Sequence, residues 1–173
     1  EVSQAIEFLL LMAAIDGPSP HHLQFRNIDV EAPDQIAIQT VIHACDYNQA
    51  CRVLQLAQEG RLGGIGNLPD ERTFNLVLSK CHDPGQAKDI IRKMHLSRRY
   101  RIGAVPPSKL SYTKAITICR KAQDVESARY FLSSARDNGI KPDVFMYSAA
   151  IWAATGSSDV TAALEFLSEM EAN

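Results

Sequence analysis

The sequence predicts an all-α protein in which similar helix–turn–helix repeats stack into a superhelical solenoid, right-handed or similarly wound. An eight-residue helical pattern led by alanine recurs five times along the 173 residues. Proline followed by aspartate or serine separates most of the resulting hairpins, and strand-like alternation is missing. Because a short helical hairpin cannot bury its apolar face alone, neighbouring hairpins must cover one another.

The recurring pattern is alanine, two variable residues, two large apolar residues, two variable residues, and then methionine or alanine. Its apolar positions fall at i, i+3, i+4 and i+7, which form one stripe along an α-helix. We expect this helix to be the second of each hairpin, with an alanine small enough for another helix to approach closely. The five segments are Ala5–Met12, Ala50–Ala57, Ala87–Met94, Ala128–Ala135 and Ala163–Met170.

We also predict a first helix before four of these segments. In each, two large apolar residues stand four positions apart, as on one face of a helix. The four stretches are residues 38–42, 74–78, 112–116 and 147–151. Each follows a proline, which ends the preceding helix, and an Asp or Ser, which can accept hydrogen bonds from the free N–H groups of a first turn. These seam pairs are Pro33-Asp34, Pro69-Asp70, Pro107-Ser108 and Pro142-Asp143.

Counting from the residue after each seam pair divides the chain into repeats of one domain, residues 1–173, with about nine helices. The repeats are 35–70, 71–108, 109–143 and 144–173, preceded by a partial repeat at 1–34. The chain begins Glu1-Val2 without an initiator methionine, so we expect a processed form or a fragment whose presequence is absent.

Three of the four cysteines occupy the eleventh position of their repeats. They are Cys45, Cys81 and Cys119. Cysteine is among the most buried residue types, so we expect these side chains, and Cys51 in a second helix, to pack in the interior. We expect His43 at a helix surface, and Trp152 in the core or between repeats.

Several residues together resemble the pentatricopeptide repeat family. Tyr or Phe followed by Asn, Thr or Ser stands at the fourth and fifth positions of three repeats, as Phe74-Asn75, Tyr112-Thr113 and Tyr147-Ser148. The match is most specific in residues 109–173, which contain the run from Gly139 to Ser148 with its Pro-Asp seam. The related tetratricopeptide repeat favours Gly or Ala at the eighth position, where this chain has Ile42, Leu78, Ile116 and Ile151.

The resemblance implies an RNA-binding protein of the mitochondrion or chloroplast that acts in RNA processing, splicing, stability or translation. Such proteins bind single-stranded RNA, one base per repeat. The fifth residue of a repeat and the last residue before the next repeat select the base, through hydrogen bonds to its Watson–Crick edge. Carried over by position, the base-reading residues are Gln39 with Asp70, Asn75 with Ser108, Thr113 with Asp143, and Ser148.

The same resemblance implies the bases. Thr113 with Asp143 is similar to the family's guanine combination, Asn75 with Ser108 indicates a pyrimidine, and Ser148 suggests a purine; the base at Gln39 stays open. The second residue of each repeat packs against the bases, which assigns Ile36, Arg72, Leu110 and Phe145. Lys121 matches the family's basic thirteenth residue, a phosphate contact, and a basic patch adds Lys80, Arg98, Arg99 and Arg101.

The charge distribution leaves two kinds of partner open. The formal net charge is −2, but residues 71–121 carry +9, whereas residues 1–70 carry −6 and residues 122–173 carry −5. A strongly basic middle third favours a polyanion such as RNA. The acidic flanks and the unusual Gln39 favour the alternative, a protein-interaction scaffold whose concave groove binds a peptide, another protein or a second copy.

Signatures of catalysis are missing from the sequence. There is no Cys-x-x-Cys, and none of the five histidines is followed two residues later by Glu, as a zinc deaminase requires. The segment Gly63–Gly66 lacks the Gly-Lys-Ser/Thr of a phosphate-binding loop. We therefore expect no enzyme activity, metal, cofactor or small-molecule substrate. The longest apolar run, Phe8–Ile15, is too short to span a membrane, which takes roughly 20 residues.

Overall fold

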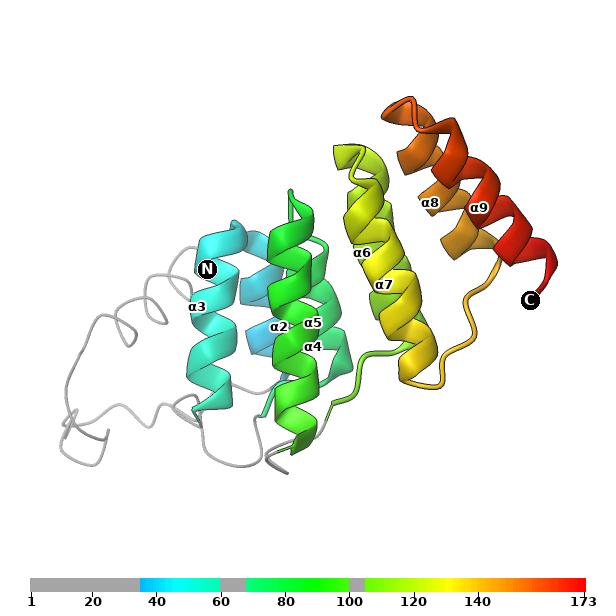
Figure 1. Ribbon diagram of the computed structural model, residues 1–173. Helices are drawn as coiled ribbons and strands as arrows, with labels where there is room; N and C mark the ends of the chain where they lie inside the picture. Colours follow the sequence, from blue (N-terminus) through cyan, green and yellow to red (C-terminus); the bar gives the residue numbers. More distant parts are fainter. Residues whose placement is uncertain (1–34, 60–67, 100–104) are drawn as a thin grey trace, which may run out of the picture. The chain divides into compact units, whose positions relative to one another are not determined.

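The structure is a computed structural model that describes residues 35–59, 68–99 and 105–173, with the side chains of all but 97–99. These residues form eight α-helices, and none of the described segments is a strand, which confirms the predicted all-α class (Figure 1). The predicted helix at 5–12, the seam at 33–34 and the glycine-rich segment 63–66 lie outside the described residues.

The chain divides into two compact units, and the division falls inside the predicted repeat 71–108. The first unit comprises residues 1–80 and 101–103, and the second comprises 81–100 and 104–173. The described helices of the first unit are α2 (Gln35–Ala44), α3 (Tyr47–Gln58) and α4 (Glu71–Leu78). Those of the second are α5 (Pro84–Arg99), α6 (Lys109–Ala122), α7 (Val125–Asp137), α8 (Val144–Gly156) and α9 (Val160–Glu171).

In the first unit, the three helices pack around one apolar centre. Helix α2 contacts both α3 and α4, and α3 contacts α4. The apolar pairs that predicted the first helices of this unit are buried, as are the aliphatic residues Val53, Leu54 and Leu56 of α3. At 1% exposure or less are Ile38, Ile42, Leu54, Phe74 and Leu78. The stripe read from the sequence therefore marks the face that each helix buries.

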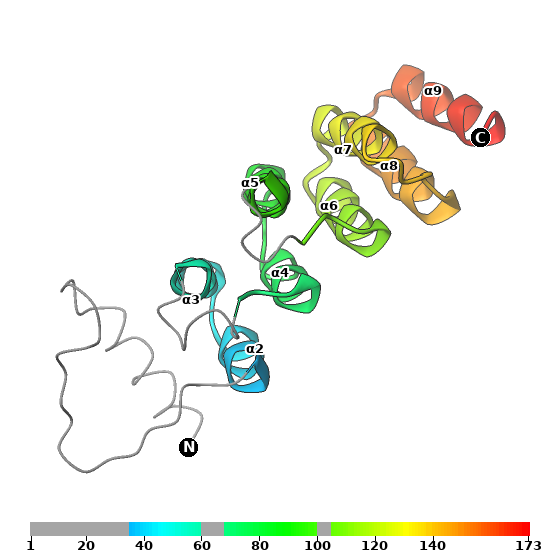
Figure 2. The same cartoon turned by 90° about the horizontal axis from the view of Figure 1, so that it is seen from below.

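In the second unit, first and second helices form two rows. Helix α6 packs against α5, α7 and α8, while α8 also packs against α7 and α9. Viewed as in Figure 2, α5, α7 and α9 follow one another on one side, and α6 and α8 lie on the other. The hairpins α6–α7 and α8–α9 thus contact each other mainly through their first helices.

A buried tyrosine at the fourth position links the two helices of each hairpin in the second unit. The amide of Asn138 donates to the hydroxyl of Tyr112 over 3.1 Å, and the amide of Asn173 donates to that of Tyr147 over 3.2 Å. Tyr112 in turn donates to the carbonyl of Ser134. A buried hydroxyl without a partner would destabilise the fold, so these bonds allow a polar atom to reach the core. Burial raises the pKa of Tyr112.

The three seam residues that the structure describes cap α4, α6 and α8, as predicted. Asp70, Ser108 and Asp143 have extended backbone and accept hydrogen bonds from the N–H groups of Thr73, Ser111 and Met146, at 2.8, 3.4 and 2.9 Å. Each bond satisfies one of the donors that a helix start leaves unpaired.

A second series of caps was missed from the sequence. An aspartate stands four residues before the repeated alanine of each described second helix, and its carboxylate accepts from the N–H group three residues later, at 2.9 to 3.0 Å. The signal Asp-x-x-x-Ala was visible beside the alanine pattern. Its members are Asp46, Asp83, Asp124 and Asp159.

The cysteines of the eleventh position are buried, as predicted. Cys45, Cys81 and Cys119 are each at most 7% exposed, and the thiol of Cys119 donates to the carbonyl of Ala115. Burial raises the pKa of Cys119 to about 12, so its thiol stays protonated at neutral pH. Cys51, also expected in the interior, is only half-buried.

Helix α9 departs from the buried stripe of its equivalents. Phe166 is fully buried, but Leu167 is 38% exposed, whereas the equivalent Leu132 of α7 is fully buried. Helix α8 packs against α7, whereas α9 packs chiefly against α8 and meets α7 through the side chains of Arg129 and Arg136. The apolar pattern specifies which face can be buried, and a neighbouring helix decides whether it is.

We predict that Asp124→Ala lowers the free energy of unfolding by about 1 kcal/mol, because the first turn of α7 loses its cap. Urea denaturation followed by circular dichroism measures this change. Asp124→Asn, which keeps an acceptor oxygen, is the matched control and should retain most of the stability. Equal stability of all three proteins would contradict the capping role.

The cap also makes stability depend on pH. Burial by itself raises the pKa of Asp124, but the bonds from Ser127 and the charge of Lys88 outweigh it and lower the pKa below 3.8. The cap therefore stabilises the fold fully above that ordinary value and is lost as the pH falls through the lowered pKa. Acid denaturation of Asp124→Asn should lack this contribution.

Candidate nucleic-acid interface

The second residue of every described first helix is exposed. Ile36 is 72% exposed on α2, Leu110 is 53% exposed on α6, and Phe145 is 77% exposed on α8. Arg72 of α4 is exposed as well. A single exposed apolar side chain needs no explanation, but three at one repeat position form a pattern. Since i and i+3 share a helix face, the fifth residue lies beside the second.

The structure brings one predicted base-reading pair into direct contact. The amide Nε2 of Gln39 donates to both carboxylate oxygens of Asp70, at 3.3 and 3.2 Å. Asp70 also accepts from the backbone and hydroxyl of Thr73 while capping α4. The fifth residue of this repeat and the last residue before the next therefore form one hydrogen-bonded group.

The second predicted pair is divided between the compact units, with Asn75 in the first and Ser108 in the second. Asn75 is only 6% exposed, and its amide donates to the Glu71 carboxylate over 3.2 Å. Ser108 forms a capping box with Ser111 at the start of α6. For Asn75 to contact a base, its side chain would have to leave this buried position.

A lysine that the sequence analysis did not select lies between the residues of the third pair. The backbone carbonyl of Lys109 accepts the hydroxyl of Thr113 at 2.8 Å, and its ammonium forms an ion pair with Oδ2 of Asp143 at 2.9 Å. Thr113 and Asp143 are thus both held by the first residue of their repeat. The sequence did contain a signal for this contact. The repeat begins with a basic residue and ends with an acidic one.

The carboxylate of Asp143 is held in its ionised form. Burial by itself raises its pKa, but the Met146 N–H and the Lys109 ammonium, followed by the Phe145 N–H, lower it below 3.8. An ionised carboxylate can only accept hydrogen bonds. At neutral pH Asp143 therefore favours a ligand edge that carries N–H donors.

On α8 the structure exposes the side chain that was expected in the interior. Trp152 is 64% exposed, so the prediction that it packs in the core or between repeats is wrong. Trp152 is not among the buried residues of α8, which are Met146, Tyr147, Ala149, Ala150, Ala153 and Ala154. Ser148, the predicted base-reading residue of this repeat, is half-buried on the face that also bears Phe145 and Trp152.

The predicted phosphate contacts occupy different surroundings. Lys121 is exposed in the last turn of α6. Lys80 donates from its ammonium to the carbonyl of His43 at 2.6 Å, where it caps the carboxyl end of α2, and His43 itself is exposed as expected. Arg98 and Arg99 lie in the last turn of α5 by their backbone, and Arg101 lies outside the described residues.

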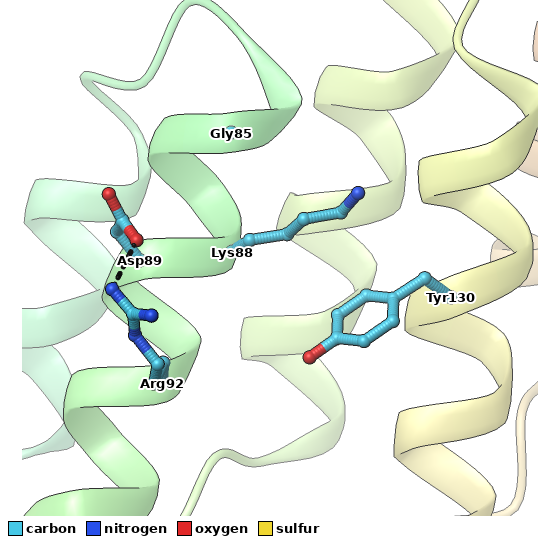
Figure 3. A pocket seen from close by; sticks show the side chains of 5 residues that line it. All are labelled: Gly85, Lys88, Asp89, Arg92 and Tyr130. Atoms are coloured by element: carbon cyan, nitrogen blue, oxygen red, sulfur yellow. Dashed lines mark hydrogen bonds and ion pairs between the residues drawn. The ribbon is translucent and has the colours of Figure 1, made fainter.

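Two other basic residues of α5, Lys88 and Arg92, line a hollow between two second helices. It measures about 460 Å³ and is bordered by Gly85, Lys88, Asp89, Arg92 and Tyr130. Figure 3 shows Lys88 reaching toward the ring of Tyr130 on α7, while Arg92 pairs with Asp89 on α5 itself. These charges lie on helices other than α6 and α8, which carry the exposed Leu110 and Phe145.

No family model matches the chain, and no curated protein matches it. Within the described ranges, none of the helices combines the length and the hydropathy that crossing a bilayer requires.

We predict that Lys109→Gln raises the pKa of Asp143, because the carboxylate loses its nearest cation. Carboxyl titration of Asp143 by NMR measures the shift, and Lys109→Arg should keep the wild-type midpoint. Because Lys109 is largely exposed, the change in the free energy of unfolding should stay within about 1 kcal/mol. An unchanged midpoint in Lys109→Gln would show that the ion pair does not form in solution.

Proposed function

We propose that this chain is a single-stranded RNA-binding module of the pentatricopeptide repeat type, with hairpins that continue as a solenoid. The observation that carries the proposal is the exposure of the second residue on each described first helix, beside a polar fifth residue. From the resemblance we also propose that it acts in RNA metabolism in a mitochondrion or chloroplast.

The apolar second residues support stacking on bases. Single-stranded RNA offers unstacked bases, and every base has a π-face that an aromatic or guanidinium group can cover regardless of sequence. Phe145 and Arg72 are side chains of these two kinds, and Ile36 and Leu110 provide flat aliphatic contact. Because water already surrounds these side chains, a base can reach them without a change in the fold.

The polar residues of the third pair support recognition of guanine. The Watson–Crick edge of guanine carries N–H donors, and Asp143 is an ionised acceptor at neutral pH. Lys109 orients this carboxylate and engages the Thr113 hydroxyl through its carbonyl. This is the physical basis for guanine at the repeat 109–143.

We predict that Thr113→Asn moves the preference at this repeat from guanine toward uridine, with Asp143 intact. Binding of short RNAs that differ in one base measures the change. The matched control is Ser133→Asn, an exposed serine of the second helix α7, which should leave the base preference unaltered. If Thr113→Asn keeps the wild-type preference, the base-reading assignment is wrong.

We predict that Lys121→Gln weakens binding equally for all RNA sequences. Losing one phosphate contact should reduce the slope of log K against log salt concentration by about 0.7. Filter-binding titrations over a range of KCl concentrations measure it. Arg92→Gln, on a second helix and already paired with Asp89, should leave the slope near that of the wild type. A larger reduction of the slope in Arg92→Gln than in Lys121→Gln would indicate that the RNA binds to the second helices.

A further inference from the structure

Helix α8 exposes two aromatic rings on one face. Phe145 is 77% exposed and Trp152 is 64% exposed, and they stand seven residues apart. Seven residues are close to two helical turns, so the rings share a face about 10 Å apart along the axis. Ser148, three residues after Phe145 and four before Trp152, lies between them. The two rings therefore offer two separate surfaces for stacking.

The exposure of Trp152 is a property of its repeat position. Trp152 is the ninth residue of its repeat, and the ninth residues of the other described first helices also escape burial: His43 and Ser79 are exposed, and Thr117 is half-buried. The eighth residue of a repeat is less exposed than the ninth: Ile116 is fully buried, and the equivalent Ile151 is half-buried. The ninth position is thus exposed in three of the four described repeats and half-buried in the fourth.

The neighbours of Trp152 along its own helix are small. Ala149, Thr155 and Gly156 stand three or four residues from it, and α8 contains no charged residue. Binding hot spots between proteins usually place such a ring inside a packed apolar patch. A ring with small neighbours is instead accessible to a flat partner. Near the start of α8, the exposed Lys141 supplies positive charge for a phosphate backbone, while Lys109 is paired with Asp143.

We propose that Trp152 is a second stacking platform for an unpaired RNA base, in addition to Phe145 in the same repeat. This inference rests on the proposed RNA-binding function and adds a contact at the ninth position. The ring would hold a base that lies next along the strand from the one at Phe145 and Ser148. Because stacking on an indole does not depend on the base, Trp152 would add affinity without adding sequence preference.

The experiment uses Trp152 as its own reporter, since it is the only tryptophan of the chain. The probe is a short, unstructured oligouridine RNA with one guanine. We expect saturable quenching of tryptophan emission, with the same midpoint as the anisotropy of the labelled RNA. Trp152→Ala should weaken binding about tenfold, the usual size for one stacked base, and Trp152→Phe should recover most of it. The base preference should be the same in all three proteins.

Leu164→Ala is the matched control, because Leu164 is 61% exposed on a second helix and should not affect binding. Suppose that the wild-type protein binds RNA without a change in tryptophan emission and that Trp152→Ala binds RNA with the same affinity. This result would overturn the inference and leave the proposed function standing. A wild-type protein that binds no RNA would instead overturn the proposed function. If emission shifts with protein concentration alone, Trp152 belongs to a contact between copies of the chain, and the inference is wrong.

Discussion

The hydrogen bond between the last side chain of a repeat and the first turn of the next helix is the contact on which the candidate site depends. It sets where each first helix begins, and so decides which residues become the second, fifth and ninth. The two carboxylate oxygens of Asp143 make different contacts: Oδ1 accepts a hydrogen bond from the Met146 N–H, and Oδ2 pairs with the Lys109 ammonium. The residue proposed to read a base is therefore held rigidly by the fold.

First and second helices of the second compact unit have different surfaces. The first helices expose Leu110 and Phe145, whereas α7 and α9 are joined by two ion pairs of 2.6 Å, Arg129–Glu165 and Arg136–Glu169. Opposite charges at the spacing of two turns thus connect neighbouring second helices. Apolar side chains are exposed on both kinds of helix, since Leu164 of α9 is also 61% exposed.

Features that depend on contacts three or four residues apart were predictable from the sequence. The seam caps, the alanine-led second helices and the buried cysteines all follow from local spacing. The same reasoning missed the second cap series, of which Asp124 is a member, although its signal is equally local. It also missed Lys109, because the contact with Asp143 spans a whole hairpin and depends on how α6 and α8 pack.

The sequence alone determined the all-α class, the repeat length and the start of each first helix, because helix periodicity and capping are local properties. Only the tertiary structure decided which side chains are covered. It buries Asn75, exposes Trp152 and leaves Leu167 open while its equivalent Leu132 is enclosed. The physical reason is that an apolar stripe identifies the face that a helix can bury, whereas burial itself requires a neighbouring element, and the amino-acid pattern does not specify where that neighbour lies.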